Sequence, residues 1–106
     1  MPIALTNENF KTTIEQSKNP VIIDAYAVWC GPCQQMTPIF HELEKEFGNQ
    51  YTFAKLNVDD AREVSIQLGV TSVPTFIFYK DGKIVGKHTG SMSKDDMLDL
   101  IEDMFS

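Results

Sequence analysis

The segment Asp24-Ala-Tyr-Ala-Val-Trp-Cys-Gly-Pro-Cys33 is the most informative part of the sequence. It joins a very apolar run, Val21–Val28, to an amphipathic run, Gln34–Phe47. The first run is typical of a strand buried on both faces, and the second repeats its apolar residues at helical spacing. A strand followed by a helix places Cys30 at the helix N-terminus, where unpaired backbone N–H groups and the helix dipole favour a thiolate over a thiol.

The rest of the chain alternates between strand-like and helix-like patterns. Thr6 or Asn7 is the expected cap of the first helix, and Gly69 is expected to end a later one. Asp81-Gly82 is the dipeptide of a tight hairpin turn with positive φ angles. This order predicts an α/β fold in which helices cover a mixed sheet. The further elements are a strand at Ile3–Leu5, a helix at Glu8–Lys18, a strand at Tyr51–Val58, a helix at Ala61–Leu68, strands at Thr75–Tyr79 and Ile84–His88, and a helix from about Lys94 with Ser93 as its cap.

Composition restricts the class of protein. The 106 residues fit one domain, residues 1–106, and 42% hydrophobic with 23% charged residues is typical of a soluble globular protein. Fifteen acidic against nine basic residues give a net charge of -6, which argues against nucleic acid or an anionic membrane as partner. No apolar run is long enough to span a bilayer, and no secretory signal is visible. With cysteines only in one motif, we expect a reducing compartment and therefore a cytoplasmic protein. We also expect a monomer.

The two cysteines allow three interpretations. A structural disulfide here would close only a tiny loop and stabilise weakly. A zinc site lacks ligands, because there is no other cysteine and His41 and His88 are not at ligand spacing. A redox dithiol fits the strand–helix context best. Between the cysteines, Gly31-Pro32 cannot supply a side-chain hydrogen bond to the Cys30 thiolate, which favours a reductase over an oxidase.

The motif Trp29-Cys-Gly-Pro-Cys33 resembles the active-site signature of the thioredoxin family. The resemblance covers essentially the whole chain, since further matching segments occur in the family's order and spacing: Asp24, Phe53–Asp59, Gly69–Thr75, Lys80–Gly82 and Gly90. It implies the thioredoxin fold, a central mixed five-stranded sheet flanked by four helices. It also implies a thiol–disulfide oxidoreductase that reduces disulfides in partner proteins. An NADPH-dependent thioredoxin reductase is then a second partner, which restores the Cys30–Cys33 dithiol.

The mechanism expected of such a protein uses both cysteines. The Cys30 thiolate attacks the partner's disulfide as nucleophile, and Cys33 then resolves the mixed disulfide. No metal is expected, and the chain contains no nucleotide-binding glycine pattern, so we expect no bound cofactor. Two other classes stay open: an oxidase or isomerase with the same fold, and a non-catalytic docking module.

Asp24 and Lys55 are the expected modulators of this chemistry. Asp24 interrupts an apolar strand, where burial would raise its pKa and allow it to exchange the proton of Cys33. The alternative is a structural aspartate bonded to backbone or water. In a strand with alternating polar and apolar residues, a lysine ordinarily lies on the solvent-exposed face. The resemblance suggests instead that Lys55 lies near Asp24 and helps to set its charge.

A substrate-docking rim is expected around Cys30. Most X-Pro bonds are trans, but Val73-Pro74 resembles the family's cis-proline loop, so we predict a cis bond on resemblance. The backbone of Val73 would then be free to pair with an extended substrate segment. Trp29 is either exposed docking surface or half-buried packing. The expected rim consists of Trp29, Gly31, Pro32, Val73, Pro74, Gly90 and Ser91.

Overall fold

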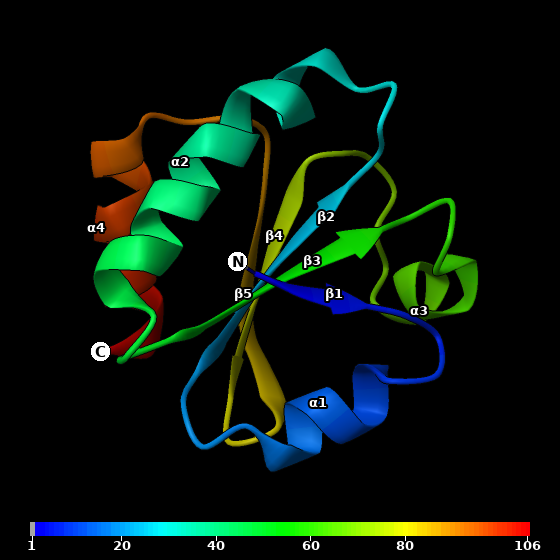
Figure 1. Cartoon of the computed structure of the whole chain (residues 1–106), viewed down its shortest axis with the longest axis horizontal. Coiled ribbons are helices and arrows are strands. Elements are labelled where there is room, and N and C mark those ends of the chain that lie inside the picture. Colours follow the sequence, from blue (N-terminus) through cyan, green and yellow to red (C-terminus); the bar gives the residue numbers. More distant parts are fainter. Residues whose placement is uncertain (1) are drawn as a thin grey trace.

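The computed structural model describes residues 2–106, and it contains a five-stranded mixed sheet with helices on both faces (Figure 1). The predicted α/β architecture is therefore confirmed. The elements are β1 (Ile3–Leu5), α1 (Phe10–Gln16), β2 (Val21–Tyr26), α2 (Gly31–Phe47), β3 (Thr52–Asn57), α3 (Arg62–Gln67), β4 (Thr75–Lys80), β5 (Lys83–Thr89) and α4 (Lys94–Phe105).

The strand order is β1-β3-β2-β4-β5, so β2 lies in the centre of the sheet. β2 and β1 each pair in parallel with β3, whereas β4 runs antiparallel to both β2 and β5. Residues Val21–Ala25 of β2 are all buried, as the apolar run predicts. A short turn joins β2 to α2, so the cysteine motif lies at the C-terminal end of the central strand (Figure 1).

Each face of the sheet carries its own hydrophobic core, because side chains alternate along a strand. Val21 and Ile23 point into a core completed by α1 and α3, which includes Ile14. Ile22 points into the opposite core, which is completed by α2 and α4 and includes Phe40. In Figure 1, α2 and α4 lie together on one side of the sheet, away from α1 and α3.

Several element boundaries differ from the expectation by one or two residues, and the end of β2 and the beginning of α1 are the two that affect the argument. β2 ends at Tyr26, not at Val28, and the following turn exposes Val28. Helix α1 begins at Phe10, and its N-cap is Asn9, so the prediction of Thr6 or Asn7 as cap is wrong. The reason is local: Thr6 and Asn9 each donate a backbone N–H to the other's side-chain oxygen, which fixes a turn before the helix begins.

The other local signals behave as expected. Asp81 and Gly82 form the β4–β5 hairpin with φ angles of 54° and 77°, and Gly69 follows α3 with a φ of 73°. Ser93 caps α4, since its hydroxyl oxygen accepts a hydrogen bond from the Asp96 backbone N–H at 3.1 Å.

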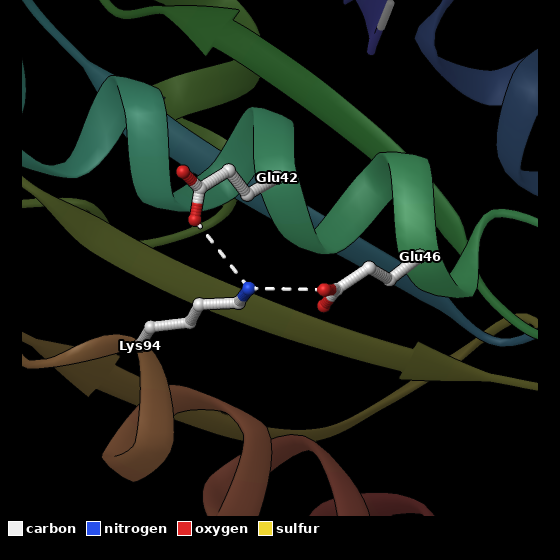
Figure 2. A network of polar contacts seen from close by, with 3 residues as sticks. All are labelled: Glu42, Glu46 and Lys94. Atoms are coloured by element: carbon white, nitrogen blue, oxygen red, sulfur yellow. Dashed lines mark hydrogen bonds and ion pairs between the residues drawn. The ribbon is translucent and has the colours of Figure 1, made fainter.

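Helices α2 and α4 are also joined at the surface by one lysine. Figure 2 shows the ammonium of Lys94, at the start of α4, between two carboxylates of α2. Its Nζ lies 3.4 Å from Glu42 and 3.1 Å from Glu46. The hydrogen bond to Glu46 is the largest cause of a raised pKa for Lys94. These ion pairs connect the beginning of α4 to the second half of α2, and the buried faces of the two helices share a core.

Candidate active site

The cysteine pair occupies the first turn of α2. Cys30 is the N-cap with extended backbone angles, and Gly31 and Pro32 form the beginning of the helix. Cys30 and Cys33 are joined in a disulfide. The backbone N–H of Cys33 donates to the Sγ of Cys30 at 3.2 Å. When the disulfide is reduced, the same N–H and the positive end of the helix dipole would stabilise a negative charge on that sulfur.

The pair is shielded from solvent more than the flanking residues are. Cys30 is 5% exposed and Cys33 is 2% exposed, and both pack against Ala27 and Val73. Gly31 and Pro32, by contrast, are exposed. Within residues 2–106, no group of three or more His, Cys, Asp or Glu side chains is arranged to hold a metal ion. The geometry is therefore that of a buried disulfide at a helix N-terminus.

Trp29 stands beside the cysteines with 69% of its surface exposed, so half-buried packing is the wrong interpretation. Its indole Nε1 donates to the Oδ2 of Asp59 at 3.0 Å, which fixes the ring over the end of β3. A hollow of about 390 Å³ lies next to it and is lined only by uncharged side chains. They are Trp29, Val58, Val70, Thr71, Ser72 and Val73.

The loop before β4 faces the same sulfur. The Val73–Pro74 bond is cis, as predicted, and the carbonyl oxygen of Val73 lies 3.7 Å from the Sγ of Cys30. In the disulfide form this sulfur carries no hydrogen, so the approach is a contact and not a hydrogen bond. The backbone N–H of Gly90 donates to the Pro74 carbonyl at 2.9 Å, and Ser91 follows on the surface. Pro74 itself is buried and Val73 is half-buried, whereas Thr71 and Ser72 before them are exposed.

Asp24 lies in β2, the strand that leads into the cysteine motif, and is fully buried. Neither of its carboxylate oxygens has a hydrogen-bond partner among the described residues, so no backbone hydrogen bond holds this side chain. Burial raises its pKa from 3.8 to about 6, and the charge of Lys55 acts in the opposite direction. Near neutral pH a measurable fraction of Asp24 therefore carries a proton.

Lys55 is the register partner of Asp24 on the neighbouring strand β3. Residues paired in this way point to the same face of the sheet, here the face covered by α2. Lys55 is half-buried and does not belong to a solvated face. Its Nζ lies 4.4 Å from the centre of the Tyr26 ring and donates to the Oγ1 of Thr37 at 3.5 Å.

Comparison with known proteins agrees with this geometry. The sequence model of the Thioredoxin family matches residues 1–103. The chain belongs to the thioredoxin family. It is similar to the thioredoxin of Alicyclobacillus acidocaldarius, with 39% identity over 95 residues that cover 90% of each chain. It is 38% identical to the thioredoxin of Mycolicibacterium smegmatis over 103 residues, covering 95% of this chain and 92% of the relative.

Membership of the thioredoxin family, together with the bonded Cys30–Cys33 pair, makes the protein a thiol–disulfide oxidoreductase. The family implies disulfide-containing proteins as substrates and a thioredoxin reductase as partner. A separate property concerns membranes: among residues 2–106, no helix has the length and apolarity needed to cross a bilayer.

Sequence reasoning missed two polar contacts of the site. The hydrogen bond from Trp29 to Asp59 joins residues 30 positions apart, and the contact of Lys55 with Thr37 joins residues 18 apart. Asp59 does end a segment that resembles the thioredoxin family, which was the only available signal. Thr37 gave no signal, since a threonine inside an amphipathic helix is ordinary.

Proposed function

We propose that the protein is a general reductant of disulfides in other proteins, and that residues 1–106 act as one domain, a cytoplasmic monomer. The observation that carries this proposal is the hydrogen bond from the Cys33 backbone N–H to the Cys30 Sγ at 3.2 Å. It gives Cys30, and not Cys33, a donor that stabilises the thiolate. Gly31-Pro32 adds no side-chain donor, so the reduced dithiol keeps its tendency to pass electrons on.

The reaction takes place in two exchange steps. The Cys30 thiolate attacks one sulfur of the partner's disulfide, and the other sulfur leaves as a thiolate. Cys33 then loses its proton and attacks Cys30, so that the partner's second sulfur leaves. Two electrons pass to the partner, and the protein retains the Cys30–Cys33 disulfide until an NADPH-dependent thioredoxin reductase reduces it. The dithiol itself carries the electrons, and we assign no cofactor.

Asp24 is the proposed proton acceptor for Cys33. A carboxyl with a pKa of about 6 can take up a proton near neutral pH and return it when the dithiol is restored. The burial of Asp24 supports this role, because a buried carboxyl exchanges its proton with bulk water less readily than an exposed one does. Lys55 is the proposed modulator that favours the ionised form of Asp24.

The proposed docking rim combines apolar surface with free backbone. The 390 Å³ hollow offers apolar contact to residues near the substrate's disulfide, and Trp29 borders it. The half-buried Val73 supplies backbone groups for pairing with an extended segment. Gly31, Pro32, Gly90 and Ser91 form the rest of the rim, with the buried Pro74 holding the loop in place.

The test is reduction of insulin disulfides under limiting small dithiol. We expect rapid turnover by the natural sequence and none above background for Cys30→Ser. Cys33→Ser should accumulate a mixed disulfide with insulin, because the first attack proceeds and the second cannot. If the natural protein does not accelerate insulin reduction, the general-reductase proposal is wrong. A trap formed by Cys30→Ser instead of Cys33→Ser would reverse the assigned order of attack.

A further inference from the structure

Lys55 influences Asp24 without forming a direct ion pair with it. The described residues include no carboxylate in an ion pair with Lys55, although its charge acts on Asp24. A lysine ammonium on a flexible stem has no fixed position of its own. Because a Coulomb interaction depends on distance, the groups that hold Nζ in place decide how strongly Lys55 acts on Asp24.

Among the described residues, the Lys55 ammonium contacts an aromatic ring and a hydroxyl. The centre of the Tyr26 ring lies 4.4 Å from Nζ, which is a cation–π contact. This contact keeps the ammonium close to the ring but does not orient its N–H groups. The Thr37 Oγ1 lies 3.5 Å from Nζ and accepts a hydrogen bond. Thr37 also donates its hydroxyl hydrogen to the Cys33 carbonyl oxygen at 3.2 Å. A hydroxyl has one donor and two acceptor positions, so the two contacts are compatible.

A threonine that bonds back to the carbonyl four residues earlier is common in helices and needs no function. The Lys55 contact is different, because it comes from another element, strand β3. One hydroxyl thereby joins the backbone of Cys33 to the ammonium of Lys55. We infer that Thr37 is a positioning residue, whose hydroxyl holds Lys55 where its charge favours ionisation of Asp24. This inference rests on the roles proposed above for Asp24 and Lys55.

Other ionisable groups near this network stay the same in every variant of the test. The charge that acts on Asp24 is that of Lys55 on β3, and the two cysteines at the beginning of α2 do not titrate while they are bonded. Around Lys55, a hollow of about 360 Å³ is lined by further ionisable side chains: Tyr26, His41 and Asp60. Using the oxidised protein therefore removes the thiols from the measurement and leaves Asp24 as the observed group.

The experiment is a titration of the Asp24 carboxyl carbon by NMR in the oxidised protein. Thr37→Val keeps the branched shape and removes the hydroxyl, so the pKa of Asp24 should rise by about half a unit, a threefold change in proton affinity. Thr37→Ser keeps the hydroxyl and should titrate like the natural protein. Thr13→Val, a half-buried threonine of α1 on the opposite face, is the matched control and should have no effect.

Lys55→Met separates this inference from the proposal on which it rests. That variant keeps the apolar stem, loses the charge and should raise the pKa of Asp24 further. Adding Thr37→Val to it should then leave the pKa of Asp24 unchanged, because the hydroxyl acts through the ammonium.

If Thr37→Val has no effect on this pKa, or the same effect with and without Lys55, the inference is wrong while the role of Lys55 stands. If Lys55→Met has no effect, the role of Lys55 is wrong as well. Thr37→Ala serves as a second hydroxyl-free variant if the valine variant does not fold.

Discussion

Asp24 lies fully buried in the central strand, and its charged form is poorly solvated there. Its pKa in the folded protein, about 6, is above the ordinary value of 3.8, and burial is the largest cause. The folded state therefore binds the proton more tightly than the unfolded state does. Stability from this group is complete below pH 4 and is lost as the pH rises through about 6.

Asp24→Asn should consequently stabilise the protein at pH 8. The shift of about two units corresponds to a gain of roughly 3 kcal/mol in the free energy of unfolding, and the gain should disappear below about pH 4. Urea unfolding at both pH values measures it. Asp99→Asn, at an exposed position of α4, is the control and should change stability little at either pH. A destabilised Asp24→Asn at pH 8 would contradict the assigned cost of the buried charge.

Single residues of the site were predictable to different degrees. The roles of Cys30 and Asp24 could be predicted from the sequence, because each role depends on the helix or strand that contains the residue, and local pattern predicts those elements. The contacts of Thr37 with Lys55 and of Trp29 with Asp59 could not be predicted, because they depend on how α2 and the end of β3 lie against each other. That arrangement is set by core packing and not by local pattern.

Helix α4 shows how an element is fixed at its beginning. Ser93 accepts the Asp96 N–H, and Asp95 and Asp96 place negative charge in the first turn, where the helix dipole favours it. Lys94 has the unfavourable sign for this position, but Glu42 and Glu46 of α2 compensate its charge (Figure 2). These pairs are exposed, so they contribute little to stability and weaken as salt increases.

The cap should matter more than the surface ion pairs. Ser93→Ala removes the side-chain oxygen that accepts the Asp96 N–H, so it should lower the free energy of unfolding by about 1 kcal/mol. Ser93→Asp restores an acceptor oxygen and should retain the stability of the natural protein. Urea midpoints of the two variants provide the comparison. An alanine variant as stable as the aspartate variant would mean that water replaces the cap without loss.

Among the described residues, two large cores lie on opposite faces of one sheet, and a smaller cluster surrounds the two cysteines. The sequence predicted this arrangement only in part. The near-continuous apolar run of β2 indicated burial on both faces, which is correct. The strand order β1-β3-β2-β4-β5 could not be derived from pattern alone. Pairing of β2 with β3 and β4 joins segments distant along the chain, and alternation of side chains does not say which strands are neighbours.

Ile22 and Ile23 test whether the two cores are energetically separate. They are adjacent and fully buried, yet Ile22 belongs to the core under α2 and α4 and Ile23 to the core under α1 and α3. Each Ile→Val change should lower the free energy of unfolding by about 0.5–1.5 kcal/mol. Because the two side chains share no core, their effects should add to within about 0.5 kcal/mol.

Ile101→Val is the matched partner for this cycle, since Ile101 lies in the same core as Ile22. Combined with Ile22→Val it can relax the same cavity, so this pair should deviate from additivity more than Ile22 and Ile23 do. Urea unfolding of the single and double variants gives both coupling energies. A larger coupling across the sheet than within one core would mean that β2 transmits packing changes from one face to the other. The site would then respond to α1 and α3 as well as to α2, because the same strand carries Asp24 and leads into the cysteines.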